Sequence, residues 1–105
     1  MEAFIPVALL GEIAQGAMKP ADVSGRAVLV AHVGDEHFVF VRQCPHADAD
    51  LAEGELVGGL VICNNHGYRF DVATGNCALP GAECPGLTVL PVVERDGAVC
   101  VKISW

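Results

Sequence analysis

Positively charged side chains are scarce in this chain. Six Lys and Arg stand against thirteen Asp and Glu among 105 residues, which gives a formal net charge of −7. Because proteins bind phosphate backbones through clustered cations, this shortage argues against nucleic acid as a partner. A basic protein surface is the better electrostatic match for such a chain.

Long apolar segments are missing as well. No uninterrupted apolar run reaches the ~20 residues that span a bilayer. The opening MEAFIPVALLGE also carries an acid, Glu2, where a signal peptide would need positive charge. We therefore expect a soluble, cytoplasmic protein without membrane contact. Without a secretion signal, the odd number of five cysteines indicates ligands and free thiols rather than a disulfide framework.

The hydrophobic pattern is typical of antiparallel β-strands. Two segments, 25–41 and 87–105, each contain two runs rich in apolar and β-branched residues. Turn residues join the runs, Gly34–Asp35 in the first segment and Asp96–Gly97 in the second. Each segment is therefore predicted to form a β-hairpin.

The rest of the chain contains weaker signals. A further strand pair is predicted around Ser24–Gly25, and the only helix candidate is a short turn within residues 9–15. No repeat or linker divides the chain, so we expect one domain of residues 1–105. Its glycine-rich middle, residues 43–87, is poor in long apolar runs and needs another source of order, such as a metal site held by two loops.

Two short motifs in that middle region carry metal-ligand side chains. Cys44 and His46 form C-x-H, and after sixteen intervening residues Cys63 and His66 form C-x-x-H. Thiolate and imidazole suit either zinc or an iron–sulfur cluster. Zinc would need all four ligands on one tetrahedral ion, whereas a Rieske centre would need each loop to reach both irons. The spacing allows that reach, and a chance coincidence of two such pairs is the least favoured interpretation.

These motifs resemble those of Rieske-type ferredoxins, the small electron carriers of bacterial ring-hydroxylating oxygenase systems. The resemblance spans the chain and includes CPHADADLAEG and CNNHGYRFDVATG. It implies an all-β fold, a Rieske-type antiparallel β sandwich with a small cluster-binding subdomain of two loops at about 43–87. It also implies one [2Fe–2S] cluster per chain. By resemblance, Cys44 and Cys63 would ligate the buried iron, and His46 and His66 the outer one.

The sequence departs from high-potential relatives of the same family. Those proteins carry a bridging cysteine in each loop, where this chain has Ala49 and Asn65. They also place serine and tyrosine hydroxyls against the sulfurs, where this chain has Tyr68 and Phe70. Reduction adds an electron, and therefore negative charge, to the cluster. Fewer hydrogen bonds to sulfur and an acidic chain both disfavour this reduction. We therefore expect a low reduction potential.

The function implied by this resemblance is electron transfer without catalysis. The chain would carry single electrons from a flavin-containing NAD(P)H ferredoxin reductase to the Rieske centre of a terminal oxygenase in aromatic hydrocarbon catabolism. It would act as a dissociating monomer and contain no catalytic residue. The alternatives are a Rieske-like small subunit of a multisubunit reductase, such as assimilatory nitrite reductase, and a zinc-bound structural module.

Other polar and sulfur-containing residues receive simpler interpretations. Cys77 and Cys84 are expected to be free thiols in a reducing cytosol, and Cys100 to pack in the core. His32 and His37 have no partner cysteine and are expected to be core or surface strand residues. Four acids of the first loop are expected to be a solvated surface that also serves in docking beside the cluster. They are Asp48, Asp50, Glu53 and Glu55.

Overall fold

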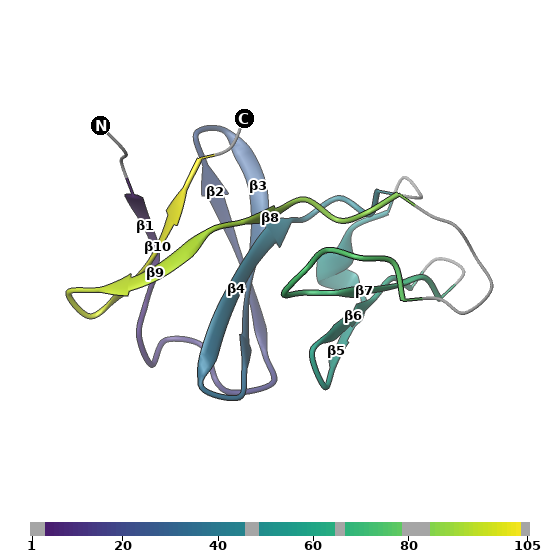
Figure 1. The fold of residues 1–105 in the computed structure, drawn as a ribbon, viewed down its shortest axis with the longest axis horizontal. Helices are drawn as coiled ribbons and strands as arrows, with labels where there is room; N and C mark the ends of the chain where they lie inside the picture. Colours follow the sequence, from purple (N-terminus) through teal and green to yellow (C-terminus); the bar gives the residue numbers. More distant parts are fainter. Residues whose placement is uncertain (1–3, 46–48, 65–66, 79–84, 104–105) are drawn as a thin grey trace.

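The computed structural model describes residues 4–45, 49–64, 67–78 and 85–103. Within these ranges the chain forms short β-strands and a single 3-10 turn, without an α-helix, which confirms the all-β expectation (Figure 1). The elements in chain order are β1 Phe4–Leu9, β2 Met18–Val23, β3 Arg26–Val33, β4 Glu36–Val41, η1 Leu51–Glu53, β5 Glu55–Val57, β6 Leu60–Ile62, β7 Arg69–Asp71, β8 Val89–Leu90, β9 Val92–Arg95 and β10 Ala98–Lys102.

The strands form three antiparallel sheets. One sheet has the order β1-β10-β9, the second β2-β3-β4-β8 and the third β5-β6-β7. In Figure 1 the four-stranded sheet lies in the middle, with the β1-β10-β9 sheet on one side and β5-β6-β7 on the other. The third sheet and η1 therefore lie apart from the first sheet.

Strand β3 of the middle sheet is buried on both faces. Successive side chains of a strand point to opposite faces, and along β3 Val28 and Val30 belong to one hydrophobic cluster while Leu29 and Ala31 belong to another. All four are completely buried. A strand covered on both faces has no need of polar alternation, which explains the uninterrupted apolar run of β3.

The predicted hairpins are present. β3 pairs with β4 in register from Val28 opposite Val41 to Val33 opposite Glu36, and β9 pairs with β10. In the second hairpin Asp96 and Gly97 have φ angles of 53° and 77°. Positive φ at both central residues is typical of the two-residue turns that match strand twist.

The helix candidate within residues 9–15 is wrong. This segment consists of turns and bends between β1 and β2. The carboxylate of Glu12 accepts a hydrogen bond from the backbone N–H of Leu9 at 2.8 Å, and Gly11 has a φ of 84°. A glycine in the left-handed conformation interrupts helical geometry, so the chain forms a turn here instead of a helix. No helix in the part of the chain seen here is long and apolar enough to cross a membrane.

Candidate metal centre

Cys44 and Cys63 come together in one hydrophobic cluster. Cys44 follows β4 and is 2% exposed, whereas Cys63 follows β6 and is fully buried. Both pack with Leu51 and Phe70 in the cluster that lies between the middle sheet and β5-β6-β7. Neither cysteine forms a disulfide. Two thiol side chains from different segments of the chain are thus buried in the same cluster, shielded from water.

The two loops close in the same way. The backbone N–H of Cys44 donates to the carbonyl of Ala49 at 2.9 Å, and that of Cys63 donates to the carbonyl of Tyr68 at 2.7 Å. Each bond joins a cysteine to the residue five positions later and encloses four residues. In sequence, His46 and His66 fall within these two enclosed segments, and both lie outside the described residues.

The donors that the structure describes fit an iron–sulfur cluster. Thiolate sulfur is the usual ligand of such clusters, and the two cysteines are shielded by apolar side chains, which limits solvent access to bound sulfide and iron. Among the residues described, no three ligand-type side chains gather around one point. Two of the four predicted ligands, the histidines, are outside that set.

Two glycines near the loops are required by close backbone approach. A Cβ atom at Gly54 would overlap the carbonyl oxygen of Ile62, the residue before Cys63. A Cβ atom at Gly75 would overlap the carbonyl oxygen of Leu87, and Gly75 also has a φ of 81°. Both glycines belong to the segments that carry the resemblance. Their physical role is to let neighbouring backbones pack against the site.

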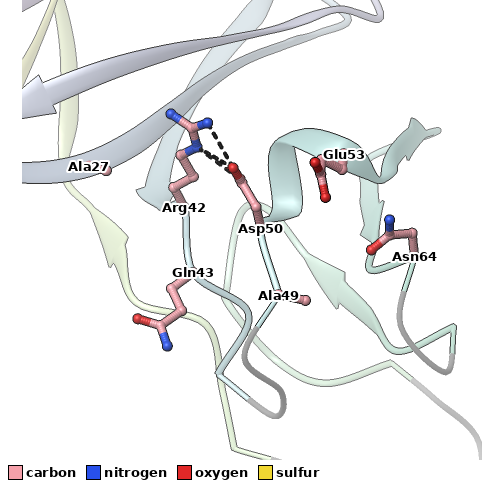
Figure 2. A pocket seen from close by; sticks show the side chains of 7 residues that line it. All are labelled: Ala27, Arg42, Gln43, Ala49, Asp50, Glu53 and Asn64. Carbon is pink, nitrogen blue, oxygen red and sulfur yellow. Dashed lines mark hydrogen bonds and ion pairs between the residues drawn. The ribbon is translucent and has the colours of Figure 1, made fainter.

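Arg42 and Asp50 form an ion pair at the base of the first loop (Figure 2). The Nε–H of Arg42 donates to both carboxylate oxygens at 2.8 and 2.9 Å, and Nη2 lies 2.7 Å from Oδ2. The hydrogen bond from this guanidinium is the main cause that lowers the pKa of Asp50 below its usual value. Sequence reasoning missed Arg42. The available signal was a lone cation flanking a loop of four acids.

The four acids of the first loop differ in their surroundings. Asp50 is held by Arg42, whereas Glu53 and Glu55 are exposed. Asp48 lies outside the described residues. Asp50, Glu53 and Asn64 line a recess of about 670 Å³ together with Arg42 (Figure 2). This recess is bordered by residues from both cysteine loops.

The remaining cysteines differ from one another in bonding and burial. Cys77 is bound in a disulfide, contrary to the expected free thiol. The expectation rested on compartment alone, which does not determine how close two thiols come in the fold. Cys84 lies outside the described residues. Cys100 is 7% exposed and packs within β10, as predicted.

His32 and His37 are strand residues, as predicted. They lie opposite each other in the β3-β4 hairpin, and their rings stack with centroids 4.2 Å apart. His32 donates from Nδ1 to the carbonyl oxygen of Ile13 at 2.8 Å. The described residues offer no hydrogen-bond partner to either ring nitrogen of His37. Burial is the largest cause that lowers the pKa of His37 below 6.5.

Several of the residues that distinguish this chain from high-potential relatives lie in or against the cysteine cluster. Phe70 is fully buried in the cysteine cluster, where it contributes no hydroxyl group. Ala49 and Tyr68 are partly buried against the same cluster. Asn65 lies outside the described residues.

Comparison with known proteins shows the family to which this chain belongs. Residues 3–94 match the model of the Rieske [2Fe–2S] domain, and the chain belongs to this family. Ferredoxin CarAc of Metapseudomonas resinovorans is 31% identical, and the match covers 93% of this chain and 92% of CarAc. The ferredoxin component of the naphthalene 1,2-dioxygenase/salicylate 5-hydroxylase systems of a Ralstonia species is 32% identical, covering 96% of both chains.

Solved structures give the same result. A chain in the complex of reduced oxygenase and oxidised ferredoxin of carbazole 1,9a-dioxygenase has a TM-score of 0.86 and 28% identity. The similarity covers 97% of this chain and 94% of that one. The expected Rieske-type fold, [2Fe–2S] cofactor and ferredoxin class are therefore confirmed, and a zinc-bound module is excluded by the family.

Proposed function

We propose that this chain is the electron-carrier component of a ring-hydroxylating oxygenase system. It takes single electrons from a flavin-containing NAD(P)H reductase and passes them to the Rieske centre of the terminal oxygenase. The observation that carries this proposal is the nearly full-length match, over 96% of both chains, to a ferredoxin component. A related ferredoxin has also been solved in complex with its oxygenase, which supports direct contact between carrier and oxygenase.

The proposed ligand set consists of Cys44, His46, Cys63 and His66 in a single domain of residues 1–105. Its cluster-binding part would be about 43–87. Cys44 and Cys63 would hold one iron, which their common burial supports. His46 and His66 would hold the other, which the similar closure of the two loops supports. The bound cluster supplies the one-electron redox group.

The chain's own residues then define how the electron enters and leaves. Leu51, Phe70 and Leu87 are buried with the two cysteines, so the cysteines themselves offer no surface to a partner. The proposed port is the opposite, histidine side. Because the electron donor uses NAD(P)H, the proposal places the protein in the cytoplasm, where it acts as a monomer that binds its two partners in turn.

Reconstitution tests this function. The purified holoprotein is mixed with an NADH-dependent flavin ferredoxin reductase and a Rieske oxygenase of such a system, and the reduction of the oxygenase is followed by stopped-flow absorbance. We expect reduction to require this chain, because it is the only carrier present. No acceleration with several such reductase and oxygenase pairs would refute the proposal.

The alternative function makes a different prediction. A Rieske-like subunit of a multisubunit reductase would copurify with a large catalytic chain and would not dissociate during gel filtration. Elution of the natively expressed protein at the size of an 11.0 kDa monomer would support the carrier. A stable complex with a catalytic chain would favour the alternative.

A further inference from the structure

The first cysteine loop is fixed at its base by a group of contacts centred on Arg42 and Asp50. Two guanidinium nitrogens of Arg42 contact the Asp50 carboxylate in a forked arrangement. Both side chains are about one third exposed, at 35% and 33%. Forked pairs fix direction as well as distance, which a single ammonium group cannot do.

The same carboxylate also begins the 3-10 turn η1. Oδ1 of Asp50 accepts the backbone N–H of Ala52 at 2.8 Å, and Asp50 is the N-cap of Leu51–Glu53. The ion pair thus connects the residue two positions before Cys44 to the start of the next element. A cap that is held in place by a second partner defines the entry direction of the chain.

Backbone bonds close the base between these two residues. Leu51 donates its N–H to the carbonyl of Arg42 at 2.9 Å, Gln43 and Asp50 form a β-bridge, and Cys44 donates to Ala49. Residues 42–44 and 49–51 therefore pair along their whole length, and the Arg42–Asp50 contact is the side-chain link across this pairing. This pairing positions the backbone of Cys44, and the ion pair supports the pairing at its base.

The turn η1 carries this constraint toward the second loop. Leu51, its first residue, is fully buried with Cys44 and Cys63. Gly54, its C-cap, lies so close to the carbonyl of Ile62 that no Cβ atom fits. Ile62 is followed directly by Cys63. A continuous path of contacts thus leads from Arg42 through Asp50 and η1 to the backbone beside the second cysteine.

We propose that Arg42 is a positioning residue for the cluster, which holds the loop of Cys44 in a fixed relation to Cys63 through its forked contact with Asp50. This proposal rests on the ligand set proposed above. Arg42 itself touches neither proposed ligand cysteine in the contacts described here. It acts through Asp50 and the paired base of the loop, and its loss should loosen the first loop while leaving the β-sheets intact.

The decisive variant removes the fork without changing net charge or the cap. Asp50→Ser retains a side-chain oxygen that caps η1, and Arg42→Met retains an apolar stem of similar length. In the double variant one positive and one negative charge are lost together. We expect iron release to a chelator to accelerate about fivefold, as for loss of a well-formed surface ion pair. We also expect an altered electron paramagnetic resonance spectrum of the reduced cluster.

A second ion pair provides the matched control. Glu12 pairs with Lys19, and its other oxygen accepts a backbone N–H, that of Leu9. Lys19 lies opposite Val30, on the face of the middle sheet that packs toward the β1-β10-β9 sheet. The Glu12→Ser/Lys19→Met variant should release iron at the parent rate and give the parent spectrum.

Two further measurements keep the test decisive if the double variant folds poorly. Arg42→Lys keeps the charge but not the fork, and it should give an intermediate iron-release rate. In the holoprotein, amide hydrogen exchange around Cys44 and Leu51, followed by mass spectrometry, should be faster in Arg42→Met than in the parent. Parent-like iron release, spectra and exchange in these variants would overturn the positioning role. Failure of the ligand assignment would appear separately, as an unchanged Rieske spectrum in His46→Ala.

Discussion

His46 and His66 are the proposed ligands that distinguish a Rieske centre from an all-cysteine cluster. Replacing either one by Ala should abolish the Rieske-type visible and electron paramagnetic resonance spectra, because both imidazoles are proposed to bind the same iron. Cys100→Ala is the matched control, since Cys100 is buried in β10 and outside the cysteine cluster. A Rieske spectrum that survives either histidine substitution would contradict the ligand set.

Gly54 and Gly75 should be intolerant of even a methyl group. At Gly54 the backbone is extended, so Gly54→Ala tests only the overlap with the carbonyl of Ile62. Such overpacking against backbone costs about 2 kcal/mol. Gly75→Ala should cost more, because its φ of 81° adds left-handed strain of about 1 kcal/mol to the overlap with Leu87.

Gly97→Ala separates the two causes. Gly97 has a φ of 77° but open space around its Cβ position, so its substitution should cost only the left-handed strain of about 1 kcal/mol. Thermal unfolding followed by circular dichroism should therefore give the lowest midpoint for Gly75→Ala, then Gly54→Ala, then Gly97→Ala. Equal midpoints for the three variants would show that neither carbonyl contact constrains the backbone.

His37 should make the fold sensitive to mild acid. Its side chain is 7% exposed and stacked on His32, and its pKa is lowered chiefly by burial and next by the charge of His32. Glu94 on the neighbouring β9 acts in the opposite direction, and Glu36 precedes His37 on the same strand. Below about pH 6.5 the unfolded chain binds a proton that the folded chain resists, so stability falls as the pH falls.

His37→Phe tests this linkage because it keeps a stacked ring and removes the titrating group. When the pH is lowered from about 7.5 to about 5.5, the melting temperature of the parent should fall further than that of the variant. The proposed histidine ligands are present in both proteins, so their contribution cancels in the comparison. An equal loss in parent and variant would show that His37 does not contribute.

Long elements of this fold could be predicted from the sequence, and short ones could not. β3 and β4 combine dense β-branched runs with the turn Gly34–Asp35, which are local signals. The β5-β6-β7 sheet consists of three-residue strands. Such strands are too short to show a period of two, and their buried residues Val61 and Phe70 pack in one cluster with Leu29 and Phe40 of the middle sheet.

The edge element β1 was missed for a related reason. Its partner is β10, at the other end of the chain, and the register shifts between Pro6 and Ala8. Pairing between distant segments leaves no local turn signal, and a proline is tolerated at an edge or a bulge. The cysteine motifs were predictable because identity and spacing alone carry their chemistry. The Arg42–Asp50 contact was not, because it depends on loop closure.

The whole molecule should have a reduction potential near the low end of the Rieske range. The net charge of −7 opposes an added electron, and buried Phe70 supplies no hydroxyl to the cysteine cluster. Potentials of Rieske centres span about −150 to +300 mV, and we expect a potential of about −150 mV for this protein. Protein-film voltammetry measures this directly. A potential in the upper half of that range would mean that other hydrogen bonds to sulfur outweigh the charge.

The negative charge of the molecule should also control how fast it meets its partners. If exposed acids near the cysteine loops steer the carrier toward basic surfaces, electron transfer from the reductase should slow as salt rises. The Debye length falls from about 10 Å at 0.1 M to about 3 Å at 1 M, and the effect should lie mainly in the association rate.

Two pairs of substitutions locate the acids responsible. Glu53 and Glu55 are exposed beside the first loop, whereas Asp50 is neutralised by Arg42 and should contribute less. Stopped-flow reduction of Glu53→Gln/Glu55→Gln should therefore show a weaker salt dependence than the parent. Glu94→Gln/Asp96→Asn removes equal charge at the exposed β9-β10 turn, away from the cysteine loops. This second pair should change the salt dependence less. If both pairs weaken the salt dependence equally, steering depends on net charge alone and not on a local docking surface.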